Sequence, residues 1–530
     1  MYGGETLPAL LPYFEKELGI DARYSDPAQE DIKDVPTPTI NHDFLEELGV
    51  NDFSRRSFEK WERIMHSHGA SLEEITGLRY SGFKRYADVV LYPFTTEHCE
   101  KLVKLAVKHN VVLVPYGGGT NVTKALKLDV NEKRMIVSVD MGRMNTVKWV
   151  DKENRMACIQ AGVMGTELER ALKPYGVCIG HEPDSHEFST LGGWISTRAS
   201  GMKKNTYGNI EDIVLNIQMV TPSGTYQKTS PWPRISNGPD MNHLIMGSEG
   251  NLGIITEAIV RIRPLPEVKI YDSIIFYDFE QGIKFMYEVS RLRQYPSSLR
   301  LVDNMQFKFG QTLKPAEDNG WKHFVDAAKK FFVLNIKGYD PDKMCAATIL
   351  CEGAKDEQVS LHKQIMKIGK KYGGMAAGAE NGLKGYLLTY LIAYIRDFGN
   401  EHFVLGESFE TSVPWSGVGT LCKRVEKRLM DETKREGFAP EHVWISFRVT
   451  QLYETGAAIY VYLCLNYRTM GKNHDELVEI YERVEDAARD EVLNCGGCIS
   501  HHHGVGKIRK RFMDRTLPPM ALEWQKKIKD

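Results

Sequence analysis

The stretch PYGGGTNV, Pro115–Val122, places three consecutive glycines two residues after the apolar run VVLV at 111–114. Glycines remove side chains where backbone N–H groups approach a diphosphate, and they permit the positive φ angles of a tight turn. The spacing matches neither the G-x-x-x-x-G-K-S/T pattern of a P-loop nor the G-x-G-x-x-G pattern of a Rossmann fold. A glycine triplet alone fits a structural turn as well as a phosphate-binding loop, so its meaning depends on the surrounding sequence.

The residues around this loop alternate between strand-like and helix-like patterns. The apolar segment 87–93 predicts a strand, and 95–110 predicts an amphipathic helix capped by Thr95 or Thr96, with Glu97 in its first turn. The run 111–116 predicts a second strand, so the loop ends an α/β unit. Further short strands are predicted at 135–140, 147–151, 156–162, 212–224 and 253–264.

The composition along the chain predicts four parts. Residues 1–80 carry helical patterns around the linker DVPTPTIN and are expected to form a helical N-terminal extension. The strand-rich part is 81–266, because the pattern changes after RPLPE near 267. Residues 267–478 mix helices with strands at 346–353 and 457–467. Residues 479–530 form the C-terminal segment, which the amphipathic helix predicted at 473–497 enters.

Composition excludes several classes of protein. Among 530 residues, 68 are Lys or Arg and 70 are Asp or Glu, so no general polyanion binder is indicated and nucleic acid is not an expected partner. No apolar run reaches the roughly 18 to 20 residues that span a bilayer. Nine scattered cysteines indicate free thiols in a reducing compartment. Cys495 and Cys498 have redox spacing, but their flanks favour a structural role.

Near the C-terminus, the stretch ISHHHGVGK at 499–507 allows three interpretations: a metal site, a set of proton-transfer groups or a polar loop. Three adjacent histidines do not easily turn their side chains to one ion, and no Asp, Glu or His with helical spacing joins them. An imidazole pKa of about 6.5 suits proton transfer and the binding of a negative charge. An active-site role is therefore favoured, and no metal is expected.

Several longer strings narrow these alternatives. PYGGGT, GHEPDS, STLGGWISTRASGMKKNTYGNIED and GSEGNLGIITEA together resemble the vanillyl-alcohol-oxidase family of FAD enzymes. SSLRLVDNMQFKFG, GESFETSVPW and SHHHGVGK are similar to the branch of that family that forms the ether bond of ether lipids. The likeness runs from about residue 30 to about 515. It implies an α+β protein with a two-subdomain FAD-binding domain of the vanillyl-alcohol-oxidase type, an α+β cap domain and the helical N-terminal extension.

The resemblance implies that FAD is held noncovalently, because Thr120 stands where relatives that attach FAD through this loop carry a histidine. Four segments match those that bind the cofactor in the family. Their residues are Tyr116, Gly117, Gly118, Gly119, Thr120, Asn121 and Val122; Asp184, Ser185, Ser189 and Thr190; Thr197, Arg198, Ala199 and Ser200; and Glu249, Gly250, Asn251, Leu252, Gly253, Ile254 and Ile255.

The remaining site residues are also implied by the resemblance. Arg396 in YIRD matches the substrate-binding arginine, whose guanidinium fork suits a phosphate. Arg300 in SLRLVDN matches a second functional arginine. Tyr460 in GAAIYVY matches the acid/base tyrosine, although the alternating pattern alone favours a core tyrosine. The triplet His501, His502 and His503 matches histidines that lie near flavin and substrate.

The implied reaction is a transfer. The acyl group of acyl-dihydroxyacetone phosphate is exchanged for a long-chain fatty alcohol through a bond to flavin N5, with no net redox change. An apolar tunnel, peripheral membrane contact, a homodimer and a peroxisomal location are implied as well, although neither an S-K-L-like tripeptide nor an N-terminal import motif is visible.

Two alternative functions remain. One is an FAD-dependent 2-hydroxy-acid dehydrogenase, whose relatives carry a GDGNLH-type string that is absent here. The other is a non-catalytic lipid-binding flavoprotein, which the presence of Arg300, Arg396, Tyr460 and the three histidines argues against.

Overall fold

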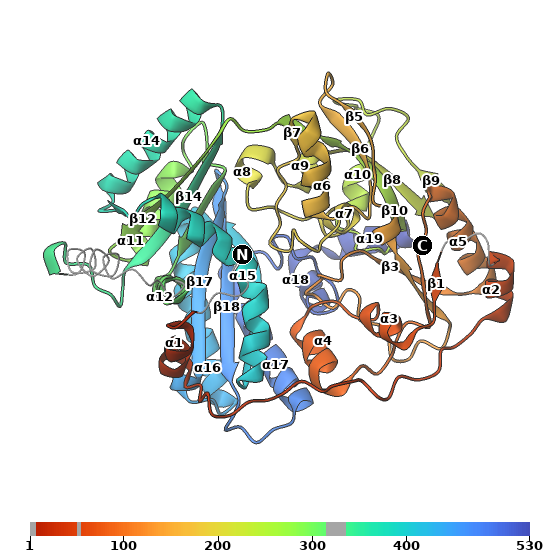
Figure 1. The fold of residues 1–530 in the computed structure, drawn as a ribbon, viewed down its shortest axis with the longest axis horizontal. Helices are drawn as coiled ribbons and strands as arrows, with labels where there is room; N and C mark the ends of the chain where they lie inside the picture. The colour runs from red at the N-terminus through yellow and green to blue at the C-terminus, as the bar shows by residue number, and fades with distance from the viewer. Residues whose placement is uncertain (1–6, 50–54, 314–334) are drawn as a thin grey trace. The chain divides into compact units, whose positions relative to one another are not determined.

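The computed structural model describes residues 7–49, 55–313 and 335–530, without the side chains of 389–394. The chain divides into two compact units (Figure 1). The glycine-loop unit comprises 28–265 and 500–530, and the seven-stranded unit comprises 1–27 and 266–499. The contacts within these units therefore place 1–27 and 28–80 in different units, and they place 500–530 in the same unit as 28–265. The division into four parts at 80, 266 and 478 stays a prediction.

The glycine-loop unit contains a four-stranded sheet in the order β1-β2-β4-β3, in which β2, β4 and β3 are parallel. Helix α5 (Thr96–His109) connects β2 to β3, and the Thr95 side chain caps it by accepting a hydrogen bond from the amide of His98, as the sequence predicted. Its apolar face packs on the sheet. The strands are β1 (Arg56–Ser57), β2 (Val89–Leu91), β3 (Val112–Tyr116) and β4 (Ile136–Asp140).

A second, antiparallel sheet in the same unit has the order β5-β6-β10-β8-β9. Four of its strands lie in the predicted segments 147–151, 156–162, 212–224 and 253–264, whereas the predicted segment 135–140 forms β4 of the first sheet. The short β9 was not predicted. They are β5 (Val147–Asp151), β6 (Met156–Gln160), β8 (Val214–Thr221), β9 (Gly224–Tyr226) and β10 (Ile254–Arg261). A separate antiparallel pair joins β7 (Val177–Cys178) to β11 (Arg263–Pro264).

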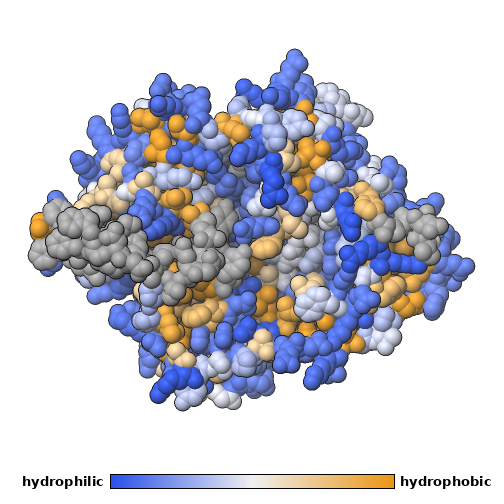
Figure 2. Space-filling model, viewed as in Figure 1, coloured by the Kyte–Doolittle hydropathy of each residue, from blue (hydrophilic) through white to orange (hydrophobic). Residues whose placement is uncertain are grey.

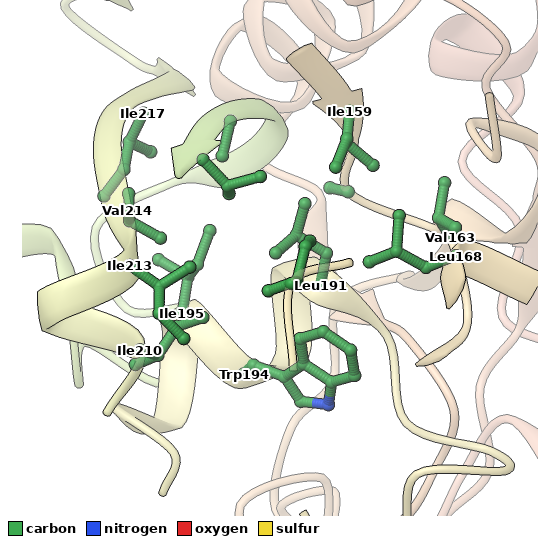
Figure 3. Close-up of a cluster of buried hydrophobic side chains, with 14 of the residues drawn as sticks. Ile159, Val163, Leu168, Leu191, Trp194, Ile195, Ile210, Ile213, Val214 and Ile217 are labelled. Carbon is green, nitrogen blue, oxygen red and sulfur yellow. The ribbon is translucent and has the colours of Figure 1, made fainter. Parts of the chain in front are cut away.

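An apolar cluster fixes α7 (Leu191–Thr197) against this second sheet (Figure 3). Leu191, Trp194 and Ile195 of α7 are buried there, together with Ile159 of β6 and Ile217 of β8. The glycines beside them let α7 approach closely, because a Cβ on Gly192 would lie 2.9 Å from that of Ala161. The other helices of the unit are α2 (His42–Leu48), α3 (Lys60–Met65), α4 (Leu72–Thr76), α6 (Gly165–Leu172), α8 (Lys204–Tyr207), α9 (Ile210–Ile213), α10 (Met241–Ile245), α18 (Met513–Thr516) and α19 (Pro519–Lys529).

The seven-stranded unit is built on one antiparallel sheet in the order β15-β12-β14-β13-β17-β18-β16. The strands at 346–353 and 457–467 were predicted and lie in β14 and β18. The strands are β12 (Val268–Phe276), β13 (Ser298–Val302), β14 (Cys345–Gly353), β15 (Met375–Ala376), β16 (Val404–Pro414), β17 (Val443–Leu452) and β18 (Gly456–Asn466).

Helices cover this sheet, and one of them comes from the start of the chain. Helix α1 (Leu10–Leu18) packs on β17 and α12, where the indole of Trp444 donates to the hydroxyl of Tyr13 at 3.0 Å. The Asn466 amide donates to the carbonyls of Leu18 and Gly19. The other helices are α11 (Phe279–Val289), α12 (Asn304–Thr312), α14 (Lys355–Lys371), α15 (Ala379–Glu401), α16 (Val418–Arg435) and α17 (His474–Asn494).

The surface is largely hydrophilic on the face that Figure 2 shows, with smaller hydrophobic areas between the charged ones. Among the described residues, no helix is long and apolar enough to cross a membrane. All nine cysteines are free thiols, as predicted. Cys498 contributes to packing, since the amide of Ser412 donates to its sulfur at 3.1 Å.

Candidate active site

The glycine loop after β3 packs so closely that side chains do not fit. A Cβ on Gly118 would lie 1.8 Å from the carbonyl oxygen of Phe188, and one on Gly117 would lie 2.5 Å from Oγ1 of Thr190. Gly119 has a φ of +66°, which side chains disfavour. Two of the four predicted cofactor segments, 116–122 and 184–190, are thus in direct contact.

The residues that flank the glycines hold the loop from both sides. The hydroxyl of Tyr116 donates to the carbonyl of Met65 at 3.1 Å, and burial raises the pKa of this phenol above its usual range. The Asn121 side-chain oxygen accepts from the amides of Thr123 and Ala125, and its own carbonyl accepts from Ala70. Asn121 therefore shapes the turn through its side chain.

Polar side chains of the second and third segments bond locally. The indole of Trp194 donates to Oγ of Ser189 at 2.7 Å, and Thr190 caps α7 by accepting from the amide of Gly193. Thr197 donates to the carbonyl of Gly193, and Ser200 donates to Asn209. These bonds fix the side chains of the two loops. Asp184, Ser185 and Ala199 lie in the same loops, and Arg198 forms an ion pair with Glu211 at 3.4 Å.

The fourth segment begins beside α7. The amide of Glu249 donates to the carbonyl of Ser196 at 2.9 Å, and Glu249 itself has a φ of +49°. Gly250 also has positive φ, and a Cβ on Gly253 would lie 2.3 Å from the carbonyl oxygen of Val220. Asn251 and Leu252 complete the turn, after which Ile254 and Ile255 start β10. The fourth predicted segment therefore contacts α7 at Ser196, the residue directly before the third predicted segment.

The turn that follows the histidines, residues 504–508 and called the histidine turn below, contacts the fourth segment and Thr123. The amide of Gly506 donates to both carboxylate oxygens of Glu249, at 3.2 and 3.0 Å, and the amide of Lys507 donates to the carbonyl of Thr123 at 2.9 Å. His501 and His502 lie with their Nδ1 atoms 2.7 Å apart, and the rings of His502 and His503 are 4.6 Å apart. The structure thus joins the histidine segment to the predicted cofactor segments.

His181 is a buried polar residue that the sequence analysis did not single out, although it belongs to the quoted string GHEPDS. It is 1% exposed, and neither ring nitrogen has a hydrogen-bond partner among the described residues. Burial lowers its pKa to about 3, so the ring is neutral, and it lies 5.0 Å from the Trp194 ring of α7. Together with the glycines that exclude side chains, this unbonded buried polar group fits a unit that holds a polar cofactor such as FAD.

Tyr460 lies in the seven-stranded unit, on β18. It stands opposite Glu410 of β16 and Arg448 of β17, so the three side chains leave the same face of the sheet. All three are buried, and the guanidinium of Arg448 lies 5.9 Å from the Tyr460 ring centre. The Tyr462 ring stacks on Tyr460 at 5.9 Å, and its hydroxyl accepts from Arg448.

The two predicted arginines belong to this unit as well. Arg300 lies on β13, is 3% exposed and places its guanidinium 5.0 Å from the ring centre of Tyr386 on α15. Arg396 lies further along α15, is partly exposed, and approaches Glu407 of β16 at 3.7 Å. Both guanidinium groups are therefore held against the seven-stranded sheet, whereas the histidines and the glycine loop belong to the other unit.

A metal centre is not indicated within the described ranges. There, no group of three or more His, Cys, Asp or Glu side chains is arranged to hold an ion.

Known proteins match both units. Residues 87–230 match the FAD binding domain family, and residues 265–530 match the C-terminal domain of FAD linked oxidases. With the glycine cradle, these matches define an FAD flavoprotein of the vanillyl-alcohol-oxidase type, as the sequence resemblance implied.

Similar proteins show to which branch of this flavoprotein family the chain belongs. The alkyldihydroxyacetonephosphate synthase of Caenorhabditis elegans is 45% identical over 99% of this chain and 87% of its own length. The enzyme of the same name from Dictyostelium discoideum is 32% identical over 96% of this chain and 83% of its own. A solved structure of an alkyldihydroxyacetonephosphate synthase matches with a TM-score of 0.84 at 31% identity, covering 98% of this chain and 91% of its own. The chain belongs to the alkyldihydroxyacetonephosphate synthase family.

Proposed function

We propose that the protein is an FAD-dependent transferase that replaces the acyl group of acyl-dihydroxyacetone phosphate with a long-chain fatty alcohol and so forms an ether bond. The observation that carries the proposal is 45% identity to an alkyldihydroxyacetonephosphate synthase along 99% of the chain. The contact between the histidine turn and the predicted cofactor segments supports it further.

The proposed cofactor site uses the glycine-loop unit. Residues 116–122 would bind the diphosphate through backbone amides, since glycines keep side chains out of that loop. Residues 184–190 and 197–200 would line the flavin, and 249–255 would lie beside the cofactor. FAD, when bound, would supply an electrophilic centre for the exchange, with no net oxidation or reduction. The chain's own residues bind the substrate, orient it and move protons.

The proposed substrate groups are the two arginines, the tyrosine and the histidines. Arg396, which is partly exposed and lies 3.7 Å from Glu407, binds the substrate phosphate through its guanidinium fork. Arg300 adds a buried positive charge. Tyr460 exchanges a proton with the reacting substrate, and His501, His502 and His503 supply imidazoles for proton transfer and for binding negative charge.

The direct test is to purify the protein, record its visible spectrum and follow the incorporation of labelled fatty alcohol into acyl-dihydroxyacetone phosphate without an electron acceptor. Ether product with stoichiometric release of fatty acid is expected. D-lactate with a dye acceptor is the matched assay for the dehydrogenase alternative. Dye reduction without ether product would replace the proposal, and a flavin-bound protein inactive in both assays would favour the lipid-binding alternative.

The mode of FAD attachment has its own test. Thr120 offers no nitrogen for a bond to flavin, so acid precipitation should release yellow flavin into the supernatant. Colour that stays in the pellet would contradict noncovalent binding.

The resemblance also supports a homodimer that contacts membrane surfaces peripherally and is located in peroxisomes. Light scattering on the purified protein and its co-sedimentation with phospholipid vesicles test the first two features. Microscopy of a tagged chain tests the third.

A further inference from the structure

Glu249 has contacts that its place in a predicted cofactor segment does not explain. Its carboxylate accepts the amide of Gly506 at 3.2 and 3.0 Å, across 257 positions of the chain. A Cβ on Gly504 would lie 2.3 Å from Oε1 of Glu249, so the carboxylate also lies directly against the residue that follows His503. The side chain therefore points at the histidine turn.

Three further contacts hold the same turn. The amides of Lys507 and Ile508 both donate to the carbonyl of Thr123, and Gly506 has positive φ with no space for a Cβ beside Thr123. The guanidinium of Arg509, which is 1% exposed, donates to the carbonyl of Gly504 at 3.1 Å. Among these described hydrogen bonds, Glu249 provides a side-chain acceptor from outside the C-terminal segment, and Thr123 provides its carbonyl while its Oγ1 also lies against Gly506.

The backbone of Glu249 is itself held in place. Its φ of +49° is uncommon for a residue with a side chain and persists where surrounding contacts determine it. The hydrogen bond from the Glu249 amide to the carbonyl of Ser196 fixes this conformation. Burial raises the pKa of the Glu249 carboxyl, and the amides of Gly506 and Val505 and the charges of Arg509 and Lys507 oppose that rise.

We propose that Glu249 is a positioning residue that fixes His501–His503 relative to the cofactor segments, and that its side chain is not a cofactor ligand. The proposal rests on the active-site role of the histidines given above. Misplacing a reacting group by about 1 Å costs roughly 100-fold in rate. Loss of the Glu249 carboxylate should therefore lower turnover while leaving FAD bound.

The test compares the wild type with Glu249→Ala and Glu249→Gln, and uses Glu257→Gln as the matched control. Glu257 on β10 is also a buried carboxylate of this unit, but it forms an ion pair with Lys148 of β5 at 2.7 Å. Three quantities are measured: flavin per chain, kcat and KM for the fatty alcohol exchange, and hydrogen–deuterium exchange in peptides that cover 500–508.

We expect Glu249→Ala to retain flavin, to lose about 100-fold in kcat and to exchange faster at 504–506. Glu249→Gln keeps one acceptor oxygen, so its loss of kcat and its increase in exchange at 504–506 should both be smaller than those of Glu249→Ala. Glu257→Gln should match the wild type in the exchange of 500–508. Loss of flavin from Glu249→Ala with unchanged exchange at 504–506 would overturn the proposal, because the side chain would then serve the cofactor.

A second variant keeps the test valid if Glu249→Ala folds poorly. Gly504→Ala introduces a methyl against the same carboxylate at a φ of +88°. Part of its effect is backbone strain, but the clash disappears when Glu249 is replaced. In a double-mutant cycle of Glu249→Ala and Gly504→Ala, the two losses of kcat should therefore be less than additive. Strictly additive losses would contradict a contact between Glu249 and Gly504.

The exchange measurement does not depend on activity. If the wild type makes no ether product, the proposed function fails, and the exchange rates still decide whether Glu249 holds the turn. If the wild type is active and Glu249→Ala keeps both its turnover and its exchange rates, the positioning role alone fails.

Discussion

The hydroxyl of Tyr460 is the group on which the proposed proton transfer depends, and the sheet around it allows that group to be removed alone. Tyr460→Phe keeps the ring that stacks on Tyr462 and lies in the buried cluster with Trp444. We therefore expect normal folding and flavin content, with kcat lower by about 100- to 10,000-fold, the range for one positioned proton donor or acceptor. Turnover and the visible spectrum of the same sample check this prediction.

A structural tyrosine of the same unit is the control. The hydroxyl of Tyr339 donates to the carbonyl of Gly373 at 2.7 Å, so Tyr339→Phe should cost about 1 kcal/mol of stability and leave kcat near the wild-type value. Full activity in Tyr460→Phe would contradict the acid/base role.

Arg396 is expected to recognise phosphate through the shape of its guanidinium as well as its charge. Arg396→Lys keeps the charge and loses the two-point geometry. We expect the free energy of transition-state binding, from kcat/KM, to fall by about 2 kcal/mol or more, the scale for a charge-assisted pair in a partly buried site. Arg424→Lys, at an exposed ion pair with Glu491, should change kcat/KM by less than about 0.5 kcal/mol. Wild-type kcat/KM in both Arg396→Lys and Arg396→Ala would exclude Arg396 from substrate binding.

At the scale of elements, the glycine loop is a close contact between two loops. In Gly118→Ala the new methyl would lie 1.8 Å from the carbonyl oxygen of Phe188, so the backbone of one of the two loops has to move. We expect weaker FAD binding and a lower melting temperature, measured by flavin release on dilution and by thermal unfolding. Gly419→Ala on α16, where the nearest atom is at 3.9 Å, should be neutral or stabilising by up to about 1 kcal/mol. Tight flavin binding in Gly118→Ala would argue against this loop as the diphosphate site.

Much of the element structure was predictable because it follows from local patterns. The alternation and capping around α5 predicted its bounds to within one residue and its cap at Thr95 or Thr96, of which the structure uses Thr95. The long helix α17 likewise ends at Asn494, near its predicted end. The resemblance to the vanillyl-alcohol-oxidase family predicted the FAD-binding architecture, which the domain matches confirm.

What the sequence did not predict are contacts between distant segments. No local pattern links Glu249 to Gly506, or places Arg448 and Glu410 on either side of Tyr460, because these pairings depend on turn geometry and sheet register. His181 was quoted within a motif but not singled out, since burial without a hydrogen bond is not visible in sequence. The roles of Arg300, Arg396, Tyr460 and the histidines stay predictions that the experiments above address.

At the scale of the whole chain, the first helix belongs to the sheet near the other end of the sequence. Leu18 is fully buried in the cluster that contains Tyr460 and Trp444. Leu18→Ala should therefore destabilise the seven-stranded unit by about 2–5 kcal/mol, the usual cost of such a cavity. Urea unfolding followed by tryptophan fluorescence measures it, with the exposed Val107→Ala as control. An N-terminal extension that packed independently would leave the unfolding of that unit unchanged.

The interruption of the glycine-loop unit by 266–499 imposes an order on its assembly during translation. Domains usually fold as they emerge, and ribosomes add roughly 5–20 residues per second, so residues 28–265 are exposed for about ten seconds or more before 500–508 arrive. During that interval Glu249 and Thr123 have no histidine turn to hold, although most of their unit has been synthesised. A nascent chain therefore acquires its predicted flavin segments well before it acquires the imidazoles to which the proposed function assigns proton transfer.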